Sequence, residues 1–359
     1  MPVKKTRTEC PQDQPNTHTA CSAADHMGAS MKTRLLSRKD IESFFTMKMC
    51  MEAVENAFAD LATGNATMPQ RTPITVPDKH GLALFMPAHI KSLGALGAKV
   101  VTVYKDNAAK HNLPTVLGTI ILLDEDTGFP VALMEGGYLT ATRTGAVSGV
   151  ATKYMARPET RVAALFGTGV QAFTQVLGVH EARPLTKLFV YSLDRVEARR
   201  SFADRITAKI GVPVHLADDP AAVVAQADIV ILATTASAPV LDGRWLKPGT
   251  HINGVGSHGP SARELDTLTI QKSRVVCDST AACKAEAGDF IIPAQAGEWG
   301  WDKVAGDLGG VIIGKVLGRT TPEEITLFKS VGLAVQDMSA ARFVFNEAVK
   351  RNIGTEFQF

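Results

Sequence analysis

A short glycine-rich segment, residues 167–172, constrains the fold of this chain more than any other feature. It reads GTGVQA, follows an apolar strand pattern over residues 161–166 and precedes an apolar helical pattern. In a dinucleotide-binding βαβ unit, the first glycine permits the tight turn, the second lets the backbone approach a pyrophosphate, and a small third residue, here Ala172, lets the helix pack on the strand. The amides at the start of that helix then face the anion. A Gly-rich turn without a ligand would explain the string alone, but the flanking patterns favour nucleotide binding.

The chain after this segment alternates between strand and helix patterns. This alternation is typical of a parallel sheet with helices on both faces. We therefore predict an α/β fold of the Rossmann type, with a doubly wound parallel sheet. Its further strands are expected at residues 187–192, 212–216, 228–234, 250–255 and 274–277.

The chain before the segment has a different pattern, in which apolar runs are separated by tight turn signals. This pattern indicates an antiparallel or mixed sheet, and a helix rich in small residues follows over residues 139–156. The small residues suit close packing against another helix or a cofactor, and they suit an ordinary connecting helix equally well. A last helical pattern, residues 332–350, is expected to return to this first domain. The apolar runs are residues 71–76, 81–86, 97–103, 115–123 and 130–135.

Composition excludes several classes of function. With 45% hydrophobic residues, 21% charged residues and a net charge of +2, the chain reads as an ordinary globular protein without a nucleic-acid partner. No run approaches the length of a membrane span, and the first residues lack the apolar core of a secretory signal. The 5 cysteines have no CxxC spacing, which favours reduced thiols in the cytoplasm and no metal site.

Three motifs together resemble the ornithine cyclodeaminase/μ-crystallin family. They are TRTGA at residues 142–146, the GTGVQA segment, and NGVGS at residues 253–257 followed by RELD at residues 263–266. The resemblance extends from about Lys32 to Glu356. It implies a homodimer formed through the non-Rossmann domain and NAD(P)-dependent chemistry at a carbon that bears an amino or imino group.

These features predict two domains after a flexible tail, residues 1–30. A mixed α+β domain for substrate binding and dimerisation would comprise residues 31–150 and be completed by residues 325–359. The NAD(P)-binding Rossmann domain would comprise residues 151–324. A chain of 359 residues is long enough for two cores of this size.

Three basic residues are the candidates for substrate chemistry. Lys99 lies in an apolar strand pattern, where a buried ammonium is costly unless a polar or anionic group meets it; an edge-strand lysine whose charged end reaches water would give the same pattern. The resemblance implies that Lys99 protonates or hydrogen-bonds a carbonyl, imine or carbinolamine. Because guanidinium groups donate paired hydrogen bonds to a carboxylate, Arg71 and Arg143 are the expected clamp for an amino-acid carboxylate. For Arg71, an ordinary surface charge is the alternative.

Two positions depart from the cyclodeaminase pattern. Cyclodeaminases carry an aspartate where this chain has His258 and a glutamate where it has Met86, so Met86 is expected at the substrate. His258 is either a substituted acid or base or a polar residue of a cofactor-facing loop. Without both carboxylates, reduction of an imino or 2-oxo acid is favoured over conversion of ornithine to proline and ammonia. A non-catalytic, NADP-retaining ligand binder of the crystallin type is the alternative of another class.

The end of the strand at residues 187–192 should meet the adenosine ribose. An NAD enzyme usually has an acidic residue there, whereas Ser192 and Arg195 suit a 2′-phosphate; NADP is therefore favoured, and Asp194 leaves NAD open. The partner is expected to be a small amino or imino acid. The residues expected to contact the dinucleotide are Thr144, Gly167, Thr168, Gly169, Val170, Gln171, Ser192, Asp194, Arg195, Ala233, Thr234, Thr235, Val255 and Gly256.

Overall fold

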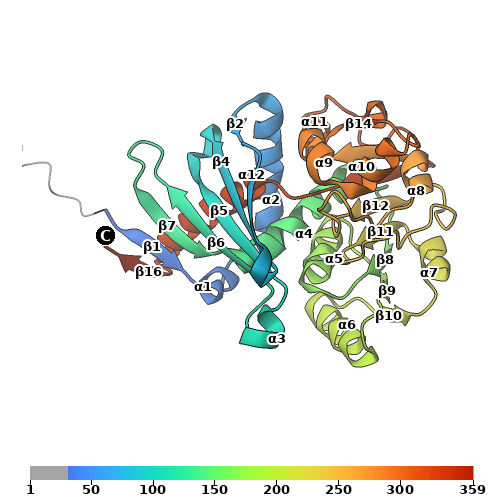
Figure 1. Ribbon diagram of the computed structural model, residues 1–359, viewed down its shortest axis with the longest axis horizontal. Coiled ribbons are helices and arrows are strands. Elements are labelled where there is room, and N and C mark those ends of the chain that lie inside the picture. Colours follow the sequence, from blue (N-terminus) through green and yellow to red (C-terminus); the bar gives the residue numbers. More distant parts are fainter. Residues whose placement is uncertain (1–30, 359) are drawn as a thin grey trace, which may run out of the picture.

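The chain forms two lobes, each built around one sheet, with a long helix between them (Figure 1). The computed structural model describes residues 31–358. The tail predicted at residues 1–30 lies outside these described residues. Within residues 31–358, no helix is both long and apolar enough to cross a membrane. We refer to the two halves as the mixed-sheet lobe and the parallel-sheet lobe.

The mixed-sheet lobe confirms the mixed sheet expected before the glycine-rich segment. Its strands are β1 (Thr33–Leu36), β2 (Ala66–Thr67), β3 (Thr72–Val76), β4 (Gly81–Ile90), β5 (Ala95–Tyr104), β6 (Val116–Leu123), β7 (Pro130–Glu135) and β16 (Thr355–Phe357). The order is β16-β1-β7-β6-β5-β4-β2, with β3 also paired to β4. The β1–β7 pair is parallel and the other pairs are antiparallel.

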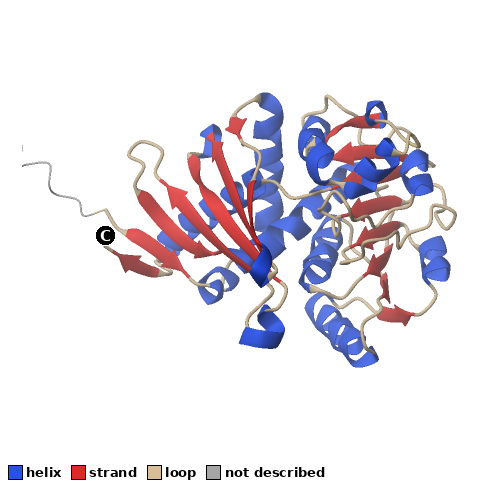
Figure 2. Ribbon diagram, viewed as in Figure 1, coloured by secondary structure: helices blue, strands red, loops and turns tan. Residues whose placement is uncertain are grey.

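Helices cover one face of this sheet (Figure 2). They are α1 (Arg38–Glu42), α2 (Met47–Thr63), α4 (Gly136–Met155) and α12 (Ala334–Arg351), while α3 (Asn107–His111) lies in the β5–β6 connection. The helix α12 packs on β4, β5 and β6. The last helical pattern of the sequence thus returns to the first lobe, as expected.

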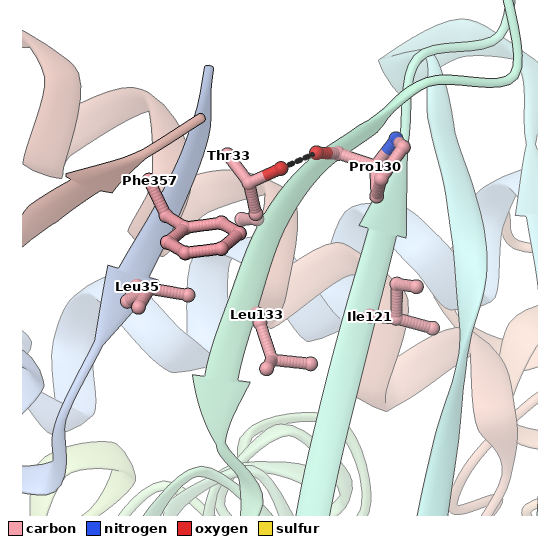
Figure 3. Close-up of a pocket in the computed structure, with 7 residues that line it drawn as sticks. Thr33, Leu35, Ile121, Pro130, Leu133 and Phe357 are labelled. Atoms are coloured by element: carbon pink, nitrogen blue, oxygen red, sulfur yellow. Dashed lines mark hydrogen bonds between the residues drawn. The ribbon is translucent and has the colours of Figure 1, made fainter. Parts of the chain in front are cut away.

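The two faces of the mixed sheet have different surroundings. Lys99 and Ile120 are cross-strand neighbours on the covered face, and both are buried. Because side chains alternate along a strand, Ile121 lies on the opposite face, beside Leu133. Figure 3 shows a pocket on that outer face. Its volume is about 270 Å³. Its lining residues are Thr33, Leu35, Ile121, Pro130, Ala132, Leu133 and Phe357. This pocket is therefore separate from the face that carries Lys99.

The parallel-sheet lobe confirms the predicted Rossmann-type architecture. Its strands are β8 (Val162–Phe166), β9 (Lys187–Tyr191), β10 (Val214–Ala217), β11 (Ile229–Leu232), β12 (His251–Gly254), β13 (Ser273–Cys277), β14 (Val304–Asp307) and β15 (Ile325–Lys329). All pairs are parallel, in the order β10-β9-β8-β11-β12-β15-β13-β14. The helices are α5 (Val170–Ala182), α6 (Val196–Ile210), α7 (Pro220–Gln226), α8 (Thr267–Lys272), α9 (Thr280–Glu286), α10 (Gly288–Gln295) and α11 (Leu308–Ile312).

Alternate side chains of the central strands enter two separate cores. Ala163 and Leu165 of β8 belong to the core under α5 and α6, whereas Ala164 and Phe166 belong to the core under α7, α8 and α10. A strand buried on both faces is apolar along most of its length, which explains the continuous apolar sequence VAALF of β8.

Two predicted domain boundaries need correction. The return to the first domain was expected at residue 325, but β15 lies between β12 and β13 in the parallel sheet. Its ITLFK sequence is buried from Thr326 onward, so the apolar run completes this sheet, and the chain crosses back only after Lys329. The boundary at residue 150 also falls within α4, which continues to Met155.

The small residues of α4 allow it to pack closely on α5. A Cβ atom added to Gly145 would lie 2.1 Å from the carbonyl oxygen of Thr174, and one added to Gly178 would lie 2.0 Å from the carbonyl oxygen of Gly145. Of the two partners expected from the sequence, a helix or a cofactor, the structure gives α4 a helix at these positions. This contact joins the two lobes.

Candidate active site

Lys99 projects from the middle of β5 into the covered side of the mixed sheet. Its side chain is 1% exposed, and its Nζ lies 2.7 Å from Oδ2 of Asp337. Met86, its cross-strand neighbour on β4, is also buried. Burial lowers the pKa of Lys99 to about 7; the charge of Arg143 acts in the same direction and Asp337 opposes both. The ammonium is therefore poised to exchange a proton near neutral pH.

Arg143 is the second buried cation of this cluster. Its Nε donates to Oδ1 of Asp337 at 2.8 Å, and its Nη1 donates to Oε1 of Gln336 at 2.5 Å. Asp337 is fully buried and lies in the first turn of α12. One carboxylate thus connects a strand, β5, with a helix, α4. A buried cation needs such a partner because its desolvation is otherwise uncompensated.

The loop that precedes α12 completes the surroundings of Arg143. A Cβ atom added to Gly332 would lie 3.0 Å from Nη1 of Arg143, and φ of Gly332 is +84°. Oδ2 of Asp278 accepts hydrogen bonds from the Ser330 hydroxyl at 2.8 Å and from the Val331 and Gly332 amides at 2.8 and 2.9 Å. Burial raises the pKa of Asp278, and these bonds counteract the increase. Asp278 therefore fixes the loop against Arg143.

Arg71 reaches the same loop from the residue before β3. Its Nε donates to Oε1 of Glu286 at 2.8 Å, and its Nη2 pairs with Oε2 of the same carboxylate. Its Nη1 donates to the Val331 carbonyl oxygen at 3.4 Å. Burial is the main cause that lowers the pKa of Arg71, and the positive charge of Arg143 lowers it further. The two arginines expected as a carboxylate clamp are thus close enough to interact and meet at residues 331–332.

His258 lies in the loop after β12. Its Nδ1 is 3.1 Å from the Gly256 carbonyl oxygen. The side chain retains exposed surface, but the protein around it desolvates the charged form and lowers its pKa; Arg71 and Lys329 add to this effect. The structure therefore brings His258 into electrostatic reach of Arg71 but gives it no carboxylate partner among residues 31–358.

The residues predicted for the dinucleotide gather at the carboxyl ends of β8, β9, β11 and β12. Gly167 has φ +101°, and an added Cβ atom would lie 2.6 Å from the Ala233 carbonyl oxygen. Gly169 is the N-cap of α5, makes no side-chain capping bond and has open space where a Cβ atom would lie. Backbone amides that lack a side-chain cap beside open space suit a pyrophosphate. Val170 and Gln171 occupy the first turn of the same helix.

Asp194 connects the end of β9 with the glycine-rich loop. Its Oδ2 accepts from the Ser192 hydroxyl at 2.7 Å and from the Thr168 hydroxyl. Both bonds, that from Thr168 first, lower the pKa of Asp194. Arg195 is exposed and precedes α6. The carboxylate is therefore held at the position where a ribose is expected.

A buried glutamate holds the two loops that follow β11 and β12. Oε1 of Glu264 accepts from the Thr234 amide and hydroxyl, both at 2.7 Å, and Oε2 accepts from the Gly256 and Ser257 amides at 2.8 and 3.1 Å. Burial raises the pKa of Glu264. Thr235 and Val255 flank these bonds in the chain, and Thr144 bonds within α4 and to Gln175 of α5.

Several residues of the site were not predicted from the sequence. An acidic residue in the otherwise apolar start of a helix, LAVQD, was a signal for Asp337, but nothing in the sequence marked its partners. Asp278 follows a strand of the parallel sheet, where functional side chains often lie. Glu264 lies in the RELD motif, which indicated the family but not the role of this residue, and Glu286 carried no signal that separates it from surface acids.

The chain combines a Rossmann-type parallel sheet, whose glycine-rich loop suits a pyrophosphate, with a buried cluster of cations in the other lobe. Residues 31–352 match the model of the ornithine cyclodeaminase/mu-crystallin family. The chain belongs to this family, which confirms the resemblance drawn from the three motifs.

Similar proteins include reductases and dehydrogenases. Delta(1)-pyrroline-2-carboxylate reductase of Bacillus cereus is 35% identical over 326 residues, which are 90% of this chain and 99% of that protein. The Thermococcus litoralis Delta(1)-pyrroline-2-carboxylate reductase, solved in complex with NADH and L-proline, has a TM-score of 0.87 and 43% identity, covering 90% of this chain and 99% of its own. An archaeal alanine dehydrogenase dimer with bound NAD has a TM-score of 0.85 and 33% identity, covering 92% of this chain and 100% of its own.

Proposed function

We propose that this chain is an NAD(P)H-dependent reductase of a small imino acid, or of a 2-oxo acid in the presence of an amine. It would run in reverse as an amino-acid dehydrogenase. The observation that carries the proposal is the buried contact of Lys99 with Asp337, which Arg143 shares; burial and the charge of Arg143 lower the pKa of Lys99 to about 7. The similarity to pyrroline-2-carboxylate reductases supports an imino acid as the first substrate to test.

Each cation has a distinct role in this proposal. Arg143 and Arg71 bind the substrate carboxylate through charge-assisted hydrogen bonds. Lys99 donates a proton to the nitrogen or oxygen of the reacting double bond. Asp337 keeps Lys99 and Arg143 in place, since it contacts both. A bound reduced nicotinamide would supply the hydride.

Cyclisation of ornithine is the nearest alternative, and the surroundings of Lys99 argue against it. That reaction needs a group to deprotonate the second amine. Met86 has no such group and lies buried opposite Lys99. Desolvation lowers the pKa of His258 and so favours its neutral form, which makes it the residue on which this alternative depends. A purely ligand-binding role would not explain why the pKa of the buried Lys99 is lowered toward neutral pH.

For the cofactor, we propose NAD in preference to the NADP expected from Ser192 and Arg195. The Asp194 carboxylate is held between Ser192 and Thr168, where it would repel a 2′-phosphate and accept from a ribose hydroxyl. The relatives solved with NADH and NAD support the same choice. NADP remains the alternative that Arg195 would serve.

The proposal includes a homodimer formed through the outer face of the mixed sheet. Leu133 and Phe357 line the pocket there and are 42% and 48% exposed, and the similar alanine dehydrogenase is a dimer. Leu133→Glu should therefore yield monomers in sedimentation experiments.

A cytoplasmic location is also proposed, because Cys50, Cys277 and Cys283 are unpaired thiols.

A spectrophotometric screen tests the function. Purified enzyme would be assayed at 340 nm with NADH or NADPH and with Δ1-pyrroline-2-carboxylate, other cyclic imino acids, pyruvate plus ammonia, and glyoxylate plus methylamine. We expect oxidation of the reduced nicotinamide with at least one imino acid. If all of these substrates leave the absorbance unchanged, the proposal is wrong.

A further inference from the structure

We propose that Glu286 is a positioning residue for substrate binding, because it orients the guanidinium group of Arg71. The inference rests on the proposed function insofar as the substrate carries a carboxylate. Glu286 belongs to α9 of the parallel-sheet lobe, whereas Arg71 precedes β3 of the mixed-sheet lobe. The ion pair therefore crosses from one lobe to the other.

The geometry of the ion pair leaves one side of Arg71 for a ligand. A guanidinium group can receive a carboxylate at its Nε/Nη2 edge or at its Nη1/Nη2 edge. Glu286 occupies the Nε/Nη2 edge through both of its oxygens. The Nη1 end is turned to the Val331 carbonyl oxygen at 3.4 Å, a long hydrogen bond. A second carboxylate can therefore bind end-on while Glu286 stays in place.

Glu286 holds Arg71 so that its Nη1 atom points toward the proposed substrate clamp. Val331 precedes Gly332, and Gly332 lies against Nη1 of Arg143. The two guanidinium groups thus approach adjacent backbone residues, Arg71 at Val331 and Arg143 at Gly332. Without Glu286, the only other bond found for Arg71 among residues 31–358 is the long one to Val331, so its flexible side chain would lose this orientation.

The burial of the pair strengthens this dependence. The side chains of Arg71 and Glu286 are 14% and 15% exposed, so water competes weakly for their hydrogen bonds. The segment from Asp278 to Glu286 supplies both anchors: Asp278 fixes the loop at residues 330–332, and Glu286 fixes the arginine that faces it. One short segment of the parallel-sheet lobe therefore positions both Arg71 and the loop at residues 330–332, which belong to the proposed binding site for the substrate carboxylate.

The test compares Glu286→Gln with Glu286→Asp and with a matched control. Glu347 is the control, because it is ion-paired to Lys350 and Arg351, is 17% exposed, and lies near the end of α12. Two quantities would be measured: KM and kcat with an imino acid, and the dissociation constant of pyrrole-2-carboxylate, a planar carboxylate, by calorimetry. The second needs no turnover and so remains informative if the proposed reaction is wrong.

For Glu286→Gln we expect KM and the dissociation constant to rise about tenfold, with kcat changed less than about twofold, as for loss of one member of a hydrogen-bonded network. Glu347→Gln should change neither. In an Arg71→Lys background, Glu286→Gln should add little. Glu286→Asp keeps the charge and should recover part of the affinity, and it serves as the test variant if the glutamine variant does not fold.

Two results would overturn the inference. Unchanged carboxylate affinity in Glu286→Gln would mean that Arg71 is oriented without Glu286 or does not bind substrate. Tighter binding would mean that Glu286 competes with the substrate for Arg71. Failure of the proposed function has a different signature, namely no nicotinamide oxidation by the wild-type enzyme whatever the variants do to binding.

Discussion

The two ends of the proposed site are built on opposite physical principles. At the dinucleotide end, the chain offers backbone amides, two glycines and exposed side chains around the start of α5. At the substrate end, Lys99, Arg143 and Asp337 are buried charges that compensate one another. The first end is made locally and faces solvent. The second exists only when β5, α4 and α12 are assembled.

This difference predicts how each end responds to mutation. Removing a buried charge leaves its partners desolvated and unpaired, which costs several kcal/mol. Changing an exposed polar side chain at the ribose end alters only the preference between NADH and NADPH. Substitutions at the substrate end should therefore be severe, and those at the dinucleotide end should be graded.

The largest effect is expected for Lys99→Met. Methionine keeps the volume of the side chain but donates no proton, so kcat should fall about 10³-fold, within the range typical of a lost general acid. Cofactor affinity, measured by quenching of protein fluorescence, should stay within about threefold of the wild-type value. If the variant retained a tenth of the wild-type activity, Lys99 would not be the proton donor.

Arg143→Ala should have the second largest effect. One charge-assisted contact contributes about 1.5 to 3 kcal/mol, so kcat/KM should fall by about 10- to 150-fold, mainly through KM. Arg199 is the matched control, because it is also a largely buried arginine, paired with Asp218 in the parallel-sheet lobe. Arg199→Ala should leave KM unchanged; equal effects of the two variants would mean general destabilisation.

The pH profile tests the pairing of Lys99 with Asp337. The folded pKa of Lys99 is about 7, lowered by burial, Arg143 and Arg71 and raised by Asp337. The ammonium is protonated below this pH, so the wild-type kcat/KM for reduction should fall as pH rises through about 7. Asp337→Asn removes the only one of these groups that favours the ammonium, so the fall should begin about one pH unit lower.

Asp337→Glu is the control for that experiment. It retains the negative charge and should keep the midpoint near that of the wild type even if its rate is lower. A midpoint that does not move in Asp337→Asn would show that another group controls the profile.

The smallest effect is expected at the ribose end. Asp194→Ser removes the carboxylate beside Thr168 and Ser192 and should reduce the preference for NADH over NADPH about tenfold, as measured by the ratio of kcat/KM values. Ser192→Asp should change the ratio in the opposite direction. A wild-type enzyme that strongly prefers NADPH would restore the assignment based on Ser192 and Arg195.

The same contrast explains what the sequence could predict. The glycine-rich loop, its strand and its helix are adjacent in the chain, so a local pattern was sufficient. The strands around Lys99 were found because each has its own turn signals. The substrate end depends on pairs such as Arg143 with Asp337 and Arg71 with Glu286, which are 194 and 215 residues apart. Residue types alone do not specify such pairings.

The position of β15 was missed for a related reason. Residues 325–329 form a buried strand between β12 and β13. The sequence just before them shows no helix pattern of the length expected between two parallel strands, so nothing local assigned them to the parallel sheet. The order of strands in a sheet is set by tertiary packing. The sequence therefore predicted the types of the two sheets correctly, but it missed β15 and misplaced the boundaries at residues 150 and 325.

The stoichiometry of nicotinamide oxidation tests the central claim most directly. Δ1-Pyrroline-2-carboxylate with NADH and, separately, L-ornithine with catalytic NAD would be incubated with the wild-type enzyme, and proline and absorbance at 340 nm would be followed together. The account predicts one NADH oxidised for each proline formed from the imino acid, and almost no proline from ornithine. Proline formed rapidly from ornithine without net change in absorbance would contradict it, and would assign to His258 the proton transfer that Met86 cannot perform.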